Sequence, residues 1–360
     1  YNLAIGRDAL GSDTLGSRSV ALGHDTLAAQ NFTTATDAYN VAIGYSAGTA
    51  VTTGVQNTLM GAFAGDALTD ADLNVAVGYQ ALSADTKGSR SVAIGYSALF
   101  SQNFTTSTNS FNTAVGDSAG QQVTTGLQNT LIGALAGDAL TDADDNVAIG
   151  VVALTADTLG SRSVAVGRGT LGTQNFTTAT NTYNTAVGYD AGAAVTTGVQ
   201  NTLVGGLAGD ALTDADYNVA IGVTALGGDT LGSKSTAIGY STLVNQNFTT
   251  ATDTFNTAVG YEAGAAVTTG VQNTIIGGLA GDALNTAQNN VAIGYQALTT
   301  DTKGDNSVAI GVLALSAQNF TTSTNSYNVA VGRSAGQSVT TGVQNTLIGG
   351  LAGDAQTTGV

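Results

Sequence analysis

The residues best placed to do chemistry in this sequence are short acidic clusters that recur at a fixed spacing. Three copies of an Asp-Ala-Asp-x-Asn motif supply the carboxylates of Asp70, Asp72, Asp142, Asp144, Asp214 and Asp216. Oxygen ligands at alternate positions are the arrangement that calcium prefers. The fourth copy reads Asn285-Thr286-Ala287-Gln288 and has lost both carboxylates, and no bidentate glutamate follows. Two interpretations stay open, a calcium site and an ordinary solvated turn built from Asp and Asn.

A second recurring segment, Gln-Asn-Phe-Thr-Thr-x-Thr, combines an aromatic ring with hydroxyls. Its five copies carry Phe32, Phe104, Phe176, Phe248 and Phe320, and a Tyr or Phe follows each copy. Exposed aromatics with polar neighbours suit a loop that binds a glycan, a receptor or a neighbouring fibre. In the alternative interpretation the five Phe rings pack into the core or an intermolecular groove, and the loop is a structural ridge.

The sequence contains few of the residues that commonly catalyse reactions. There is no Cys, and the single histidine is His24. A Ser-His-Asp arrangement therefore cannot recur, and a thiolate or multi-histidine metal site cannot form. We expect no enzyme activity and no resident cofactor other than the calcium considered above.

The charge balance indicates which classes of partner this chain is unsuited to bind. Lys and Arg number 9 against 25 Asp and Glu, which leaves a net charge of −16, and only 9% of residues are charged. An acidic chain this poor in cations is unsuited to nucleic acids and to anionic membranes. No apolar run approaches the roughly 20 residues of a membrane span, so we expect no membrane insertion in this segment.

The elements that position these motifs follow from an internal repeat. An aliphatic-Gly pair recurs 20 times, from Gly6 to Gly349, at spacings of 17, 21, 17 and 17 residues. These spacings add up to 72, so the 360 residues divide into five repeats, 1–72, 73–144, 145–216, 217–288 and 289–360. We expect one continuous solenoid without a separate domain. Because both ends fall in phase with the repeat, we interpret the chain as a fragment of a longer fibre.

The repeat predicts an all-β fold, a parallel β-solenoid of about 20 coils. Helical solenoid units are longer, at about 33–47 residues, and are not rich in Thr, Val, Gly and Asn. The absence of Pro leaves every backbone N–H available to a ladder. In each coil a strand of the type Asn146-Val147-Ala148-Ile149 precedes the anchor Gly. We place its third residue inside and its small middle residue outside. The resulting outward apolar stripe predicts self-association.

Strings such as Ser91-Val92-Ala93-Ile94-Gly95 and Asn74-Val75-Ala76-Val77-Gly78 resemble the YadA-like head repeat of trimeric autotransporter adhesins. The stretch from Asn112 to Thr130 resembles the longer repeat variant of phage tail fibres and other surface fibres. The resemblance implies a left-handed β-roll, a homotrimeric fibre and an extracellular location at a cell or virion surface. The predicted function is a structural shaft that presents loops for attachment to a cell-surface glycan or receptor. A host-recognising tail-fibre segment, and a calcium-stabilised, ice-binding or glycan-binding solenoid, are the alternatives.

Overall fold

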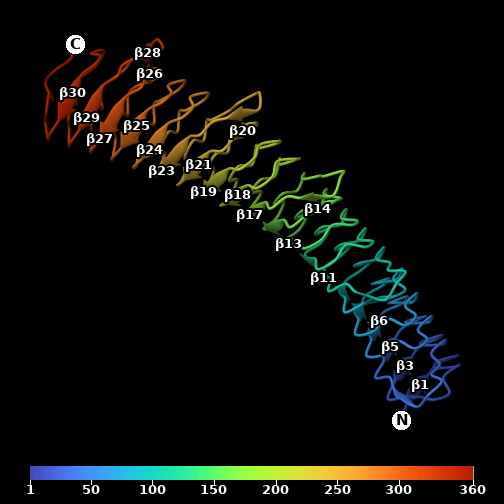
Figure 1. Ribbon diagram of the computed structural model, residues 1–360. Helices are drawn as coiled ribbons and strands as arrows, with labels where there is room; N and C mark the ends of the chain where they lie inside the picture. The colour runs from blue at the N-terminus through green and yellow to red at the C-terminus, as the bar shows by residue number, and fades with distance from the viewer. Residues whose placement is uncertain (360) are drawn as a thin grey trace. The chain divides into compact units, whose positions relative to one another are not determined.

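The computed structural model describes residues 1–359, and every regular element in that range is a β-strand. The contacts group into two compact units, residues 1–183 and residues 184–360, and each unit is described by itself. Both units are parallel β-solenoids, which confirms the predicted fold class (Figure 1). The part of the chain that the structure describes contains no helix, and hence none that could cross a lipid bilayer.

The first unit winds through ten coils, and each coil adds one strand to a parallel sheet. These strands are β1 (Leu3–Ile5), β3 (Val20–Leu22), β5 (Val41–Ile43), β6 (Thr58–Met60), β7 (Val75–Val77), β9 (Val92–Ile94), β11 (Thr113–Val115), β12 (Thr130–Ile132), β13 (Val147–Ile149) and β15 (Val164–Val166). Shorter strands pair in parallel at the side of the inserted coils, namely β2 (Gly16–Ser17) with β4 (Thr36–Asp37), β8 (Gly88–Ser89) with β10 (Thr108–Asn109), and β14 (Gly160–Ser161) with β16 (Thr180–Asn181).

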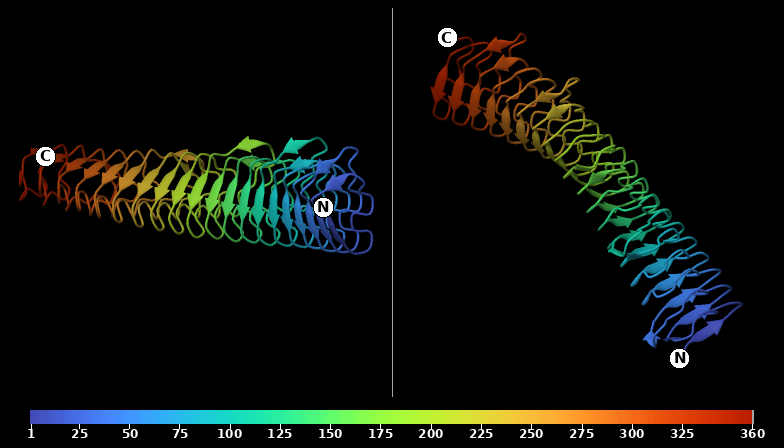
Figure 2. Two further views of the ribbon diagram at one scale, coloured as in Figure 1. Left: turned by 90° about the horizontal axis from the view of Figure 1, so that it is seen from below. Right: turned by 45° about the vertical axis from the view of Figure 1, so that its right-hand side comes forward.

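The second unit repeats this plan with ten further coils. Its main strands are β17 (Thr185–Val187), β18 (Thr202–Val204), β19 (Val219–Ile221), β21 (Thr236–Ile238), β23 (Thr257–Val259), β24 (Thr274–Ile276), β25 (Val291–Ile293), β27 (Val308–Ile310), β29 (Val329–Val331) and β30 (Thr346–Ile348). Its side pairs are β20 (Gly232–Ser233) with β22 (Thr252–Asp253), and β26 (Gly304–Asp305) with β28 (Thr324–Asn325). Figure 2 shows the main strands of each unit side by side, with the inserted coils projecting beyond them.

The strand register follows the sequence period. Leu3 lies opposite Val20, 17 residues later, whereas Val20 lies opposite Val41, 21 residues later. The four extra residues of the inserted coil leave the main sheet in register, because they are accommodated in the loop at its side. Each repeat therefore contributes four in-register strands and one projecting loop.

The orientation of the main strands is opposite to the prediction. The middle residue of each main strand from β3 to β29 is fully buried, as at Ala21, Leu131 and Ile275. The first and third residues are partly exposed and face outward, with Ile94 38% exposed. The assignment of the third residue to the interior was therefore wrong. The physical reason is the narrow interior of a short coil, which takes the single middle side chain of each strand and leaves no room for both the first and the third.

Core packing in this narrow interior depends on alternation of large and small residues. A Cβ atom built on Gly120 would lie 2.6 Å from Leu131 Cδ1, and one on Gly137 would lie 2.7 Å from Leu131 Cδ2. The Leu131 side chain therefore fills the space that the two glycines leave. In the coil of Ala148 the position equivalent to Gly137 is Leu154, which supplies the missing volume and is fully buried.

A buried Asn column ties successive coils together at the corner before each main strand. The Asn129 side chain donates from Nδ2 to the Ala143 carbonyl (2.7 Å) and accepts at Oδ1 from the Asn146 backbone N–H (3.0 Å). Its own backbone N–H donates to Asn112 Oδ1 (2.9 Å). These bonds satisfy backbone groups that no strand partner reaches, so the column is part of the ladder.

Candidate functional site

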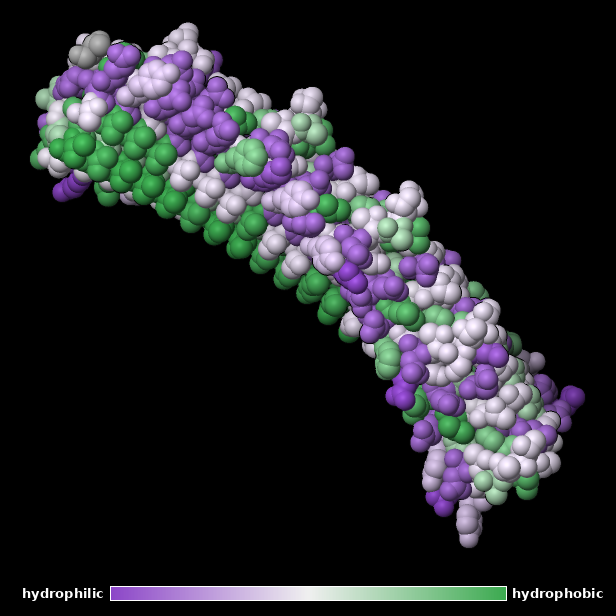
Figure 3. Space-filling view, viewed as in Figure 1, coloured by the Kyte–Doolittle hydropathy of each residue, from purple (hydrophilic) through white to green (hydrophobic). Residues whose placement is uncertain are grey.

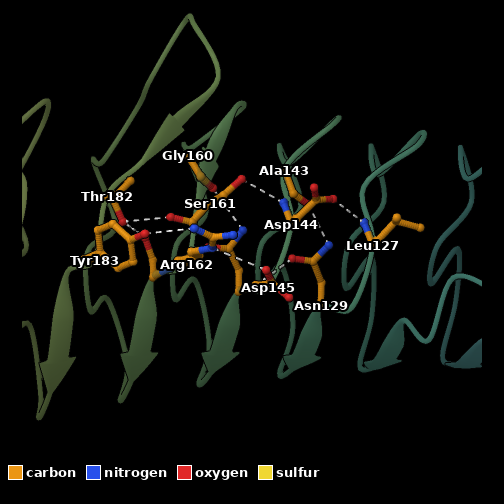
Figure 4. Close-up of polar contacts among 12 residues, drawn as sticks. Leu127, Asn129, Ala143, Asp144, Asp145, Gly160, Ser161, Arg162, Thr182 and Tyr183 are labelled. Carbon is orange, nitrogen blue, oxygen red and sulfur yellow. Dashed lines mark hydrogen bonds and ion pairs between the residues drawn. The ribbon is translucent and has the colours of Figure 1, made fainter.

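The acidic turns lie between neighbouring coils. In the second copy, Asp144 Oδ1 accepts the backbone N–H of Leu127 (2.7 Å), and the Asp144 N–H donates to Ser161 Oγ (2.9 Å), as Figure 4 shows. Asp142 Oδ1 accepts the hydroxyl of Thr125 (2.6 Å). The two carboxylates therefore each bridge to an adjacent coil and do not converge on one centre.

The third acidic copy makes the same contacts, and in the first copy Asp72 does so. Asp72 Oδ1 accepts the Val55 N–H and Asp216 Oδ1 accepts the Val199 N–H, both at 2.8 Å. Asp214 Oδ1 accepts the hydroxyl of Thr197 in the adjacent coil, whereas Asp70 Oδ1 accepts the hydroxyl of its chain neighbour Thr69. Among residues 1–359 no three acidic or imidazole side chains gather in a way that could hold a metal ion. This geometry favours the turn interpretation, and calcium stays a prediction that chelation tests.

The five Phe residues of the Gln-Asn-Phe segments lie beneath the loops. The rings of Phe32, Phe104, Phe176, Phe248 and Phe320 are only 5–7% exposed. In the second copy the ring packs on Gly88, where an added Cβ would lie 2.7 Å from Phe104 Cδ2. The exposed residues of this loop are Asn103, Thr105, Thr106, Ser107 and Asn109. A ligand of the loop would therefore meet hydroxyl and amide groups, while the rings anchor the loop. Adhesion through these loops stays a prediction.

A buried polar network holds the loop anchor in place in the second to fifth copies. Asp85 is fully buried, and its Oδ1 accepts the backbone N–H groups of Gly88 (3.0 Å) and Phe104 (3.1 Å). Its Oδ2 accepts Gln102 Nε2 (2.6 Å), and Gln102 Oε1 accepts Asn112 Nδ2 (2.8 Å). Burial raises the pKa of the Asp85 carboxyl in spite of these donors. Ser91, which takes the place of Asn in this coil, joins the network by accepting Gln102 Nε2 at its Oγ (2.8 Å).

A different set of aromatic residues is exposed on the inserted coils. We name these the corner rings, because each lies at the corner just before the buried Asn column. They are Tyr39, Phe111, Tyr183, Phe255 and Tyr327, with exposed fractions of 46–53%. The sequence shows these residues seven positions after each buried Phe, but their exposure could not be deduced from the spacing alone.

Each of the first four corner rings has a cation from the preceding coil over its face. The guanidinium carbon of Arg162 lies 5.7 Å from the centroid of the Tyr183 ring, and Arg162 Nη1 donates to the Tyr183 hydroxyl (2.8 Å) (Figure 4). On its other side Arg162 pairs with Asp145. A cation and an Asp of another coil are thus paired at Arg162, and also at Lys234 with Asp253 (2.6 Å).

The tyrosines that follow the anchor glycines pack against one another. Tyr79 stacks on Tyr96 with ring centroids 5.6 Å apart, and Tyr240 stacks on Tyr261 at 5.4 Å. Tyr45 lies between His24 and Phe63 at 5.3 Å from each. Because neighbouring rings cover these faces, the column presents edges to solvent. These rings therefore pack against one another along the solenoid.

The outward residues of the main strands form what we name the aliphatic face. Its first column is Val or Thr in almost every coil, and its third column is Ile, Val, Leu or Met in all of them. In Figure 3 hydrophobic surface follows the main strands of the second unit. An exposed apolar patch of this extent is unusual for a monomer.

No known protein family, curated protein or solved structure matches this chain. Among residues 1–359 no enclosed pocket is present either. The candidate functional surfaces are therefore open ones, the aliphatic face and the row of inserted loops with their corner rings.

Proposed function

We propose that this chain is the shaft of an extracellular fibre and that identical chains assemble through the aliphatic face. The observation that carries the proposal is the uninterrupted aliphatic third column in both units. Burial of such a surface against a second copy would remove apolar area from water at about 25 cal/mol per Å². The periodic face of one chain matches that of another chain because both share the same repeat.

The size of the face fits this role. Ten rows at about 4.8 Å, each three residues and about 10 Å wide, give roughly 480 Å² per unit and about 960 Å² for both units. A stable interface needs about 800 Å² per partner. The resemblance to adhesin head repeats favours three chains per fibre, and the same architecture suits a cell-surface adhesin or a host-recognising tail fibre.

The mass of the particle in solution tests assembly. Light scattering at micromolar concentration is expected to give three chain masses. Replacing the exposed third-column residues Ile94, Ile132, Ile221 and Ile276 with Lys is expected to give monomers with an unchanged circular dichroism spectrum. The matched control adds the same charge at the loop residues Thr106, Thr178, Thr250 and Thr322, which are exposed on another side of the coils. A monomeric parent chain, or assembly that survives the Ile-to-Lys changes, would contradict the proposal.

A further inference from the structure

The corner rings occupy a backbone position that disfavours aromatic residues. Tyr39 has φ = 53° and Tyr327 has φ = 49°, in the left-handed region that Gly and Asn prefer. Among the other coils the same corner holds Asn289 and Asn306, with φ of 60° and 61°, and in one coil Tyr217, with φ of 60°. An aromatic ring that is about half exposed gains little from burial there. Its presence in five of five inserted coils therefore needs another reason.

The cation over the ring is not that reason. In the fifth copy Asn306 takes the place of the Arg or Lys, and Tyr327 is still 53% exposed. The remaining polar partner is also kept, since Asn306 Nδ2 donates to Asn325 Oδ1 (2.7 Å), as Arg90 Nε donates to Asn109 Oδ1 (3.1 Å) in the second copy. The constant elements of the cluster are thus an exposed ring and a hydrogen-bonding side chain beside it.

We infer that the five corner rings, with the polar side chains beside them, are equivalent weak subsites for the sugar rings of an uncharged polysaccharide. The exposed part of each ring, beside amide, carboxylate or cationic groups, offers an apolar surface to C–H groups, and the polar groups offer hydrogen bonds to hydroxyls. This inference deepens the proposed function, because it rests on the shaft as the support that presents the subsites.

Charge selects an uncharged partner. The cations at Arg18 and Lys234 are paired with Asp37 and Asp253, so they offer little net positive charge to an anion. The chain as a whole carries −16 and repels an acidic polymer. A neutral polysaccharide needs no net positive charge at the subsite and is not repelled by the negative charge of the chain.

The regular spacing of the subsites favours binding of a polymer over binding of a single small sugar. Without a pocket, one flat subsite buries little of a ligand and binds weakly. In the first unit the subsites of Tyr39, Phe111 and Tyr183 lie four coils apart, which is roughly 19 Å at about 4.8 Å per coil. A long chain of sugars can engage several of them at once, and multivalent binding of this kind gains a factor of about 10² or more over one site.

The test is affinity electrophoresis of the full chain in native gels containing dextran, laminarin or mannan, with dextran sulfate as the anionic comparison. The test variant replaces Tyr39, Phe111, Tyr183, Phe255 and Tyr327 with Asn, which the same corner already accepts at Asn289 and Asn306. Neither the charge nor the fold is expected to change. The matched control replaces Tyr45, Tyr79, Tyr96, Tyr240 and Tyr261, which are 44–55% exposed, with Asn.

We expect at least one neutral polysaccharide to retard the parent chain. The corner-ring variant should bind at least tenfold more weakly, and the control should stay within twofold of the parent. Retardation by dextran sulfate alone, by none of the neutral polymers, or equally for the parent and the corner-ring variant would overturn the inference. Light scattering on the same samples separates the two proposals. A monomeric parent chain would contradict the proposed assembly into a shaft, whatever the gels show about polysaccharide binding.

Discussion

Two adjacent glycines on the second unit allow a strict test of coil stacking. Gly205 is an anchor glycine with φ = 135°, and a Cβ atom built on it would lie 2.5 Å from the carbonyl oxygen of Gly222 in the next coil. Gly206, the next residue, has no atom within 4 Å of its built Cβ. Replacement of each with Ala adds the same methyl group, so the difference between the two variants reports the close approach of successive coils together with the left-handed backbone of Gly205.

The magnitude follows from the contacts around Gly205. Backbone atoms of Gly222 cannot move without opening the ladder, where the Gly222 N–H donates to Val204 O (2.7 Å) and the Gly205 N–H donates to Val187 O (2.8 Å). Left-handed strain costs about 1–3 kcal/mol. Weakening both ladder bonds adds about 0.5–1.5 kcal/mol each. We expect Gly205→Ala to lower the free energy of unfolding by about 2–6 kcal/mol, and Gly206→Ala to raise it by about 0.4–1 kcal/mol through the unfolded chain.

Urea unfolding followed by circular dichroism measures both variants against the parent chain. Hydrogen exchange of the amides in β18 and β19 adds a local measurement, because a repeat array need not unfold in one step. Protection there should fall in Gly205→Ala and stay unchanged in Gly206→Ala. Equal stability of the two variants would refute the reasoning that backbone contact between coils makes the anchor glycine obligatory.

Three further predictions concern the loops, the carboxylates and metal. Phe104→Ala should lower the free energy of unfolding in urea by about 3–5 kcal/mol, whereas Phe111→Ala, at an exposed ring, should change it by less than about 0.5 kcal/mol; equal effects would place both rings in the same environment. Burial raises the pKa of Asp66 and of Asp282 above that of the unfolded chain. Their contribution to stability is therefore present below the unfolded value near 3.8 and lost as pH rises through the folded pKa. The melting temperature of the parent chain should fall as the pH rises from 4 to 8, and it should fall less steeply in the double variant Asp66→Asn/Asp282→Asn. An unchanged slope in the double variant would contradict a role of these two carboxyls in the pH dependence. Addition of EDTA should leave the melting temperature unchanged if Asp70, Asp142 and their equivalents serve the turns, and a decrease would support calcium.

The period of the sequence was sufficient to predict the fold class. The 17-residue spacing of the anchor glycines predicts parallel stacking, because a residue and its counterpart one coil later must lie in register. The buried Asn column and the absence of Pro follow from the same need to satisfy every backbone group of the ladder. These properties are local or periodic, and each coil repeats them.

The direction in which side chains point was decided by the tertiary structure. Alternation along Val147-Ala148-Ile149 separates the middle residue from its neighbours but does not say which set is inside. The interior volume decides, and it is set by the other columns, where Leu131 needs Gly120 and Gly137 to make room.

The same reason applies to the aromatic residues of the inserted coil. Phe104 and Phe111 lie seven residues apart in one segment with no difference in residue type. Only the packing of the ring of Phe104 on Gly88, above the Asp85 network, separates the buried ring from the exposed one. The sequence by itself therefore determined the repeat, the ladder and the positions of both rings. The available space between coils, a property of several columns together, determined which ring anchors the loop and which one faces solvent.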